Sequence, residues 1–177
     1  MALAEQTKPN GNIGVAYTYN EPFVGYEFIG DCAKLVREAG LCNVLVTNGY
    51  VNREPLEELL PYINAMNIDL KCFSEGGYKK LGGSLEPVKE TIARAYGRCH
   101  LEITTLIIPG ENDTDEEISE LARWLAALGT EIPLHLSRFF PQYRYTEDRM
   151  ATPRESILRL REIAKQHLQY VFAGNMG

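Results

Sequence analysis

The sequence predicts an α/β fold built on a parallel β-sheet, and two observations indicate it. β-branched apolar runs alternate with runs whose apolar residues recur at helical spacing. The alternation repeats at intervals of roughly 23 to 35 residues, which suits strand–helix–strand units with right-handed crossovers. Six expected strands are too few for a closed eight-stranded barrel, so a partial barrel and a doubly wound sheet both fit the pattern. No Ser/Gly-rich linker interrupts residues 1–177, which indicates a single domain.

Strands are expected at the β-branched runs and helices at the amphipathic runs. The expected strands cover 13–18, 43–48, 66–71, 100–108, 133–138 and 168–173, and the expected helices run from about 23 to 39, 55 to 64, 86 to 96, 114 to 128 and 152 to 166. Gly40 and Gly129 follow two of these helices, as C-terminal capping glycines do. The Gly-rich segment 74–83 is expected to be a connection.

The spacing of apolar residues predicts which face of each helix is buried. For the first helix it predicts a buried face made of Val24, Phe28, Cys32, Leu35 and Val36. Two later helices are expected to begin with capping boxes, because Thr114 and Thr152 are each followed three residues later by Glu.

The segment 17–22, Tyr-Thr-Tyr-Asn-Glu-Pro, lies where the first expected strand ends and the first expected helix begins. Pro in a first helical turn is typical of such a junction, and in α/β folds this junction faces the ligand crevice. Asn20 and Glu21 therefore indicate a ligand clamp. The alternative is that Asn20 only caps the helix and Glu21 only favours its positive N-terminal end.

Polar residues on other expected strands strengthen the first interpretation. Strands buried on both faces are normally almost wholly apolar, yet polar residues occur at Thr47, Asn48, Asp69, Lys71, Glu102, Thr104, His135 and Ser137. Residues two apart leave the same face of a strand, so several strands bring polar groups to one region. Each group also has a structural interpretation: an Asp69–Lys71 ion pair, a hydrogen-bonded His135 and a turn at Asn48.

Composition argues against several classes of protein. The net charge of −6 and the pI of about 5.2 do not suit a nucleic-acid-binding surface, which needs a basic patch. No apolar run approaches the roughly 20 residues of a membrane span, and the polar first residues do not form a signal peptide. We therefore expect a cytoplasmic protein with neither a nucleic acid nor a membrane as partner.

The four cysteines, Cys32, Cys42, Cys72 and Cys99, follow no metal-binding spacing. Each lies within or beside an apolar segment. This pattern predicts buried free thiols in a reducing compartment rather than ligands of zinc or of an iron–sulfur cluster.

Four motifs in a fixed order resemble one enzyme family. They are Ala-Tyr-Thr-Tyr-Asn-Glu-Pro at 16–22, Thr-Asn-Gly at 47–49, Ile-Asp-Leu-Lys at 68–71 and Ile-Pro-Gly-Glu-Asn-Asp at 108–113. Together they are similar to motifs of the radical S-adenosylmethionine (SAM) enzymes. The most similar branch is the one related to pyruvate formate-lyase activating enzyme, and within it the AmmeMemoRadiSam-type proteins.

The resemblance implies a partial, three-quarter (βα)6 barrel of the radical SAM type, with SAM as cofactor and a protein among its substrates. It assigns to SAM binding the residues Asn20, Glu21, Asn48, Asp69, Lys71 and His135. It places Glu21 at the methionyl amino group, Lys71 at the methionyl carboxylate and His135 at the ribose or adenine. A carboxylate facing an ammonium makes a charge-assisted hydrogen bond, which explains a Glu in the first of these roles. It assigns no catalytic residue and no metal ligand.

One part of the family pattern is missing. The [4Fe–4S] cluster of these enzymes is held by C-x3-C-x2-C, which does not occur in the sequence, and the first expected strand matches the family's second. We therefore expect a fragment that lacks the first βα unit and does not by itself cleave SAM to the 5′-deoxyadenosyl radical. Loss of that unit would leave the strand at 13–18 with an unpaired apolar edge, which predicts self-association through this strand.

Two other functions fit the sequence. A non-catalytic cofactor-binding or interaction domain would keep the cleft without the chemistry. A barrel aldolase would form a Schiff base at Lys71, although Asp69 beside it would favour the charged amine, which is not nucleophilic. The substrate is not indicated by any motif, and the polar segment 142–150 is the expected substrate loop.

Overall fold

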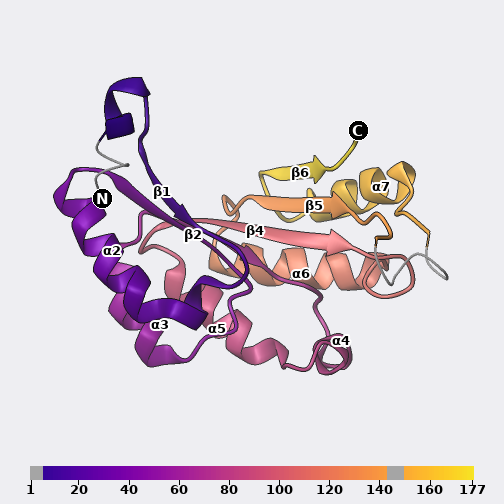
Figure 1. Cartoon of the computed structure of the whole chain (residues 1–177). Coiled ribbons are helices and arrows are strands. Elements are labelled where there is room, and N and C mark those ends of the chain that lie inside the picture. The colour runs from indigo at the N-terminus through magenta and orange to yellow at the C-terminus, as the bar shows by residue number, and fades with distance from the viewer. Residues whose placement is uncertain (1–5, 143–149) are drawn as a thin grey trace. The chain divides into compact units, whose positions relative to one another are not determined.

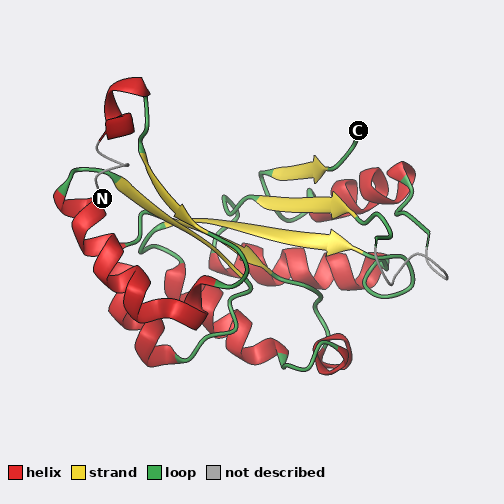
Figure 2. Cartoon of the chain, viewed as in Figure 1, coloured by secondary structure: helices red, strands yellow, loops and turns green. Residues whose placement is uncertain are grey.

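The structure, a computed structural model, describes residues 6–142 and 150–177. Six parallel strands alternate with helices (Figures 1 and 2). The strands are β1 (Gly14–Tyr17), β2 (Cys42–Thr47), β3 (Ala65–Asp69), β4 (His100–Ile107), β5 (Leu134–Arg138) and β6 (Val171–Gly174), and their order is that of the chain. The neighbouring strands β1–β2, β2–β3, β4–β5 and β5–β6 pair in parallel, as the sequence predicts.

The helices occupy the segments between the strands. The α-helices are α2 (Tyr26–Glu38), α3 (Arg53–Leu59), α4 (Glu75–Lys80), α5 (Leu85–Ala95), α6 (Asp115–Leu128) and α7 (Arg154–Ala164), and the 3-10 helices are η1 (Lys8–Asn10), η2 (Pro22–Gly25) and η3 (Leu60–Tyr62). Among the described residues, no helix is both long and apolar enough to cross a membrane.

The chain forms two compact units. The first contains the residues up to Ile68 together with Glu86–Leu101, and the second contains Asp69–Leu85 and Glu102–Gly177. The expectation of a single domain over residues 1–177 stays a prediction.

The first unit holds β1, β2 and most of β3, packed with α2, α3 and α5. Its core includes the fully or almost fully buried side chains of Ala33, Leu45, Leu56, Met66, Ile68, Val88 and Ile92.

A buried polar network joins the elements of the first unit around Asn43, which is 0% exposed. The Asn43 amide donates to the carbonyls of Ala33 (2.9 Å) and Tyr62 (3.0 Å) and accepts from the Tyr17 hydroxyl (3.0 Å). Burial raises the pKa of the Tyr17 hydroxyl to about 12, so Tyr17 stays a donor at neutral pH.

The prediction of which face of α2 is buried is wrong in part. Val24 and Phe28 are 86% and 71% exposed, whereas Ile29 and Ala33 are buried. Val36 is buried as expected. The chain enters through η2, which has about three residues per turn, and the α-helix begins only at Tyr26. Within α2 the buried side chains at 29, 33 and 36 form a stripe one residue on from the predicted positions 28, 32 and 35, and Leu35 is 47% exposed.

The second unit holds most of β4, together with β5, β6, α4, α6 and α7. Its core is lined by Ile103, Ile107, Ile118, Leu121, Leu125, Leu134, Leu136, Ile157 and Leu160. Thr114 caps α6 as predicted, because its side chain accepts from the Glu117 amide (3.2 Å). The Glu117 carboxylate also accepts from the Phe73 amide at 2.6 Å.

Two other local predictions in this unit are wrong. Thr152 does not cap α7: its hydroxyl donates to the Ile107 carbonyl (2.5 Å) and accepts from the Phe139 amide (3.1 Å), so it joins the ends of β4 and β5. The Gly-rich segment 74–83 contains the helix α4, which begins because the Ser74 side chain accepts from the Gly77 amide (3.2 Å). The expected substrate loop at 142–150 lies mostly outside the described residues.

Candidate functional site

Glu21 ties the end of β1 to the end of β2 in the first unit. Its Oε1 accepts from the Phe23 amide (3.2 Å) and from the Thr47 hydroxyl (2.6 Å), and its Oε2 accepts from the Asn48 amide (2.7 Å). It is also the N-cap of η2, so the capping role lies on Glu21. A carboxylate has about four acceptor positions. Three contacts leave room for one further donor, which an ammonium group could supply.

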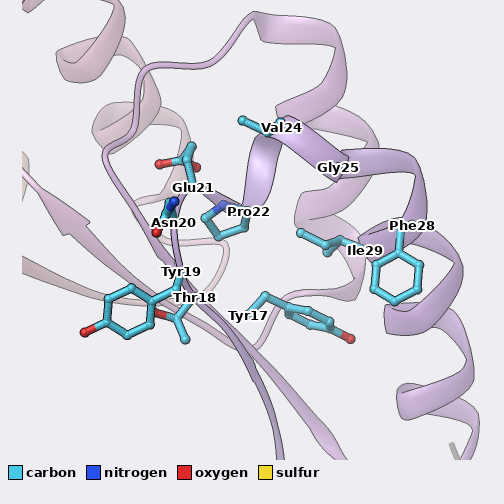
Figure 3. Close-up of a pocket in the computed structure, with 10 residues that line it drawn as sticks. All are labelled: Tyr17, Thr18, Tyr19, Asn20, Glu21, Pro22, Val24, Gly25, Phe28 and Ile29. Carbon is cyan, nitrogen blue, oxygen red and sulfur yellow. The ribbon is translucent and has the colours of Figure 1, made fainter.

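A pocket of about 550 Å³ surrounds this junction and is lined by Tyr17 to Pro22 with Val24, Gly25, Phe28 and Ile29. Figure 3 shows the rings of Tyr17 and Tyr19 pointing to opposite sides of the chain, with Tyr17 toward Ile29 and Phe28. Asn20 is exposed at the same junction. The pocket thus has a polar end at Asn20 and Glu21 and an apolar end on α2.

Asn48 makes a local turn besides its contact with Glu21. Its Oδ1 accepts from the Tyr50 amide at 2.8 Å, which is an Asx turn. Gly49 has a φ of +69°, and a Cβ there would lie 2.8 Å from Ile68. The turn interpretation of Asn48-Gly49 is therefore confirmed, and it sets the Asn48 amide against Glu21.

Asp69 and Lys71 form an ion pair in the second unit. Lys71 Nζ lies 2.5 Å from Asp69 Oδ2, and the two side chains are 42% and 35% exposed. Exposed pairs of this kind contribute about 0–1 kcal/mol to stability. Because the amine is paired and solvated, the geometry does not favour a Schiff-base role, which needs a desolvated amine.

Three side chains hold the backbone at Lys71 and its neighbour Leu70. The Asn112 amide donates to the carbonyls of Lys71 (2.8 Å) and Leu106 (2.9 Å), while its Oδ1 accepts from the Ile108 amide (2.8 Å). Thr105 donates to the Leu70 carbonyl (2.9 Å), and the Lys71 amide donates to the Tyr78 hydroxyl (3.3 Å). Asn112, the Asn of the Ile-Pro-Gly-Glu-Asn-Asp motif, thus links the segment after β3 to the end of β4 through buried hydrogen bonds. Sequence reasoning did not predict this role.

His135 is held on β5 by its neighbours on β4 and β6. Its Nε2 lies 2.8 Å from Glu102 Oε2, and its ring stacks on Phe172 with centroids 5.2 Å apart. The register sets Thr104, His135 and Phe172 side by side. With Glu102 ionised, Nε2 carries the proton and Nδ1 can accept a hydrogen bond. Sequence reasoning noted Glu102 only as a polar strand residue and did not predict the stacking of Phe172.

The six predicted residues thus divide between the two units. In the first, Glu21 contacts Asn48, and Asn20 precedes Glu21 in the chain. The second contains the Asp69–Lys71 pair and, separately, His135 with Glu102. That all six bind one cofactor stays a prediction.

The residues present do not fit an iron–sulfur cluster. Cys72 and Cys99 have pKa values raised by burial, that of Cys99 to about 11, whereas Cys42 is exposed. Within residues 6–142 and 150–177, no three His, Cys, Asp or Glu side chains are grouped as a metal site. A cluster needs thiolates arranged around the iron, and these four cysteines do not provide that arrangement.

A family model described as the radical SAM superfamily matches residues 1–125. The chain belongs to this superfamily. An uncharacterised protein of Methanocaldococcus jannaschii is 41% identical over 167 residues, which cover 92% of this chain and 49% of the relative. The isethionate sulfite-lyase activating enzyme of Oleidesulfovibrio alaskensis is 26% identical over 151 residues, covering 82% of this chain and 48% of the relative. The chain thus spans about half the length of these curated relatives.

A solved structure shows the same fold. A domain of the pyruvate-formate lyase-activating enzyme from Bacteroides vulgatus superposes with a TM-score of 0.79 at 19% identity, covering 92% of this chain and 99% of the domain. The predicted fold class, an α/β partial barrel of the radical SAM type, is confirmed. The predicted resemblance to activating enzymes is confirmed as well.

Proposed function

We propose that this chain is the SAM-binding part of a radical SAM protein of the glycyl-radical activating kind. Glu21 carries the proposal: its carboxylate is fixed by three hydrogen bonds at a βα junction and keeps an acceptor position for the methionyl ammonium. Lys71 would bind the methionyl carboxylate, with Asp69 orienting its ammonium. His135, oriented by Glu102, would accept from a ribose hydroxyl or contact the adenine, and Asn20 and Asn48 would complete the contacts.

When a cluster-bearing segment is supplied, SAM bound to such a protein is a source of the 5′-deoxyadenosyl radical. The cysteines of this chain do not fit a cluster, so its own residues are assigned only to binding and orienting SAM. Radical cleavage belongs to an assembly in which another segment provides the cysteines.

For the partners we propose a protein substrate. Two similar proteins are named as activating enzymes of another enzyme. One is the activating enzyme of isethionate sulfite-lyase, and the other is that of pyruvate-formate lyase. Self-association through the edge of β1 is a second proposed interaction. A non-catalytic SAM-binding domain is the alternative function.

Binding of SAM and of 5′-methylthioadenosine to the purified chain tests the proposal. Methylthioadenosine lacks the amino acid part of SAM, so it cannot contact a group that holds the methionyl ammonium. Glu21→Gln removes the negative charge and should weaken SAM binding by about 10- to 100-fold, the effect of one charge-assisted hydrogen bond. Methylthioadenosine binding should stay within about twofold.

Calorimetric titration gives both affinities, and thermal unfolding checks that Glu21→Gln is folded. Equal weakening of both ligands would mean that Glu21 has only a structural role. An unchanged affinity for SAM would remove Glu21 from the proposed site altogether.

A further inference from the structure

Helix α2 carries a second row of apolar side chains besides the row that it buries. The buried row is at 29, 33 and 36. The second row contains Phe28, Cys32 and Leu35, and Phe28 and Leu35 are 71% and 47% exposed. These are three of the positions that the sequence predicts to be buried. An apolar row at helical spacing that stays exposed in one chain indicates a surface that another chain covers.

The exposed row lies on the flank of α2 that faces the edge of β1. The opposite flank is occupied by η3, because Arg37 donates to the Pro61 carbonyl and Lys34 Nζ lies 5.7 Å from the centre of the Tyr62 ring. Each residue advances about 100° around a helix axis, which sets the exposed row on the other side. Phe28 accordingly lines a pocket together with the end of β1 (Figure 3).

Other apolar side chains extend this surface. Val24 in η2 is 86% exposed, and Ile13 beside β1 is 79% exposed. Ile13 lies four residues before Tyr17, so both side chains leave the α2 side of the strand. A large side chain carries roughly 150–250 Å², so Ile13, Val24, Phe28 and Leu35 together expose on the order of 500 Å². With the backbone edge of β1, the surface approaches the roughly 800 Å² that each partner of a stable complex buries.

A second copy of the chain fits this surface by symmetry. Within the described part of the chain, β1 pairs only with β2. Two β1 edges related by a two-fold axis would run antiparallel, which is a regular way for strands to pair.

The same two-fold axis brings the two α2 helices together. Helix α2 connects β1 to β2 and packs over these two strands, so its axis would lie about one strand spacing, roughly 4.8 Å, from the two-fold axis. The two helices would then be about 10 Å apart on one face of the joined sheet. Packed helices lie about 8–10 Å apart, so the two exposed rows would meet.

We propose that the chain forms a two-fold dimer in which β1 pairs with β1 of a second copy and the exposed row of α2 packs on the same row of that copy. The inference rests on the proposed self-association through β1 and adds the helix contact that buries apolar surface. Phe28, Cys32 and Leu35 are then buried in the dimer, as their spacing predicts, although the single chain exposes this flank.

Leu35→Lys and Leu158→Lys form a matched pair of variants. The two leucines are 47% and 46% exposed and lie on α2 and α7, respectively, and Lys has a helix propensity close to that of Leu. Leu35→Lys puts a charge from each copy into the contact and should weaken the dimer at least about 100-fold. Phe28→Glu should do the same. Leu158→Lys should leave the dimer dissociation constant within about twofold.

Sedimentation of the purified 177-residue chain over a range of concentrations measures the dissociation constant of the dimer. Thermal unfolding at the same concentrations checks that each variant is folded. The Tm of the native chain should rise with concentration, because association stabilises the folded state, whereas the Tm of Leu35→Lys should not.

Each result bears on a different part of the proposal. A native chain that stays monomeric would overturn the dimer and the proposed self-association together. Dimers of Leu35→Lys or Phe28→Glu as tight as the native dimer would overturn the α2 contact and leave association through β1 standing. Equal weakening by Leu158→Lys would also overturn it. Titration of SAM into the same samples tests the role of Glu21 separately, so SAM binding by a monomer would overturn the dimer alone.

Discussion

Glu21 illustrates how a single residue can serve structure and ligand together. Its carboxylate caps η2 and receives the Asn48 amide, so the polypeptide fixes its orientation before any ligand arrives. A fixed carboxylate binds a cation without first paying the entropy of ordering its own side chain. The capping interpretation and the clamp interpretation of segment 17–22 are therefore compatible rather than exclusive.

At the scale of single residues, Gly76 and Gly77 are adjacent in α4, but alanine substitution is expected to change stability in opposite directions at the two positions. A Cβ at Gly76 would meet no atom within 4 Å, so Gly76→Ala should stabilise the protein by about 0.5–1 kcal/mol through helix propensity and a less flexible unfolded chain. A Cβ at Gly77 would lie 2.5 Å from Cys72 Sγ and 3.1 Å from the Ser74 Oγ that caps the helix. Gly77→Ala should therefore destabilise it by about 1–3 kcal/mol.

Urea unfolding of both variants measures these two free energies. The pair is its own control, because both substitutions add one methyl group to neighbouring positions of the same helix. Changes of the same sign would contradict the close approach of Cys72 to α4.

At the scale of elements, Asn112 connects the segment after β3 to the end of β4. Asn112→Leu would remove both donors and the acceptor, leaving the Lys71 and Leu106 carbonyls and the Ile108 amide without this partner. Because Asn112 is only 3% exposed, water cannot easily replace it. The variant should lose about 3 kcal/mol of unfolding free energy.

Asp113→Asn, in the same loop, is the control for the Asn112 prediction. Its side-chain oxygen can still accept from the Gly110 amide, which lies at 2.9 Å in the native protein, so its stability should change by less than about 0.5 kcal/mol. Chemical denaturation followed by circular dichroism measures both variants. If Asn112→Leu were as stable as the native chain, the hydrogen bonds of the Asn112 side chain would contribute nothing to the free energy of unfolding.

At the scale of the whole molecule, the free edge of β1 predicts self-association. Among the described residues β1 pairs only with β2, and Ile13 beside it is 79% exposed. The Ile13 carbonyl accepts from the Cys42 amide, so alternate residues face β2 and the Ala16 amide faces away from it. Unpaired strand edges of this kind associate readily.

Ala16→Pro tests the self-association without breaking the β1–β2 ladder, because it removes only an outward amide. Light scattering after size-exclusion chromatography should show a dimer or larger assembly for the native chain and a monomer for Ala16→Pro. Ala16→Val keeps the amide and should assemble like the native chain. A native chain that is a monodisperse monomer would disprove association through this edge.

The sequence by itself determined the succession of strands and helices, because burial of a parallel strand and of one helix face each leaves its own period in the chain. It also indicated the superfamily, since the motifs at 16–22, 47–49, 68–71 and 108–113 resemble those of radical SAM enzymes. An interaction between residues close in the sequence, such as the Thr114 cap of α6, could also be predicted.

Only the tertiary structure decided which groups meet across the sequence. In α2 the structure buries Ile29 and Ala33 and leaves the predicted Phe28 exposed. Thr152 does not cap α7, because its hydroxyl donates to the Ile107 carbonyl. Glu21 bonds to Thr47, 26 residues away, and Asn112 bonds to Lys71, 41 residues away. Hydrogen bonds of that range depend on where the chain folds back, and no local pattern of residue types encodes that position.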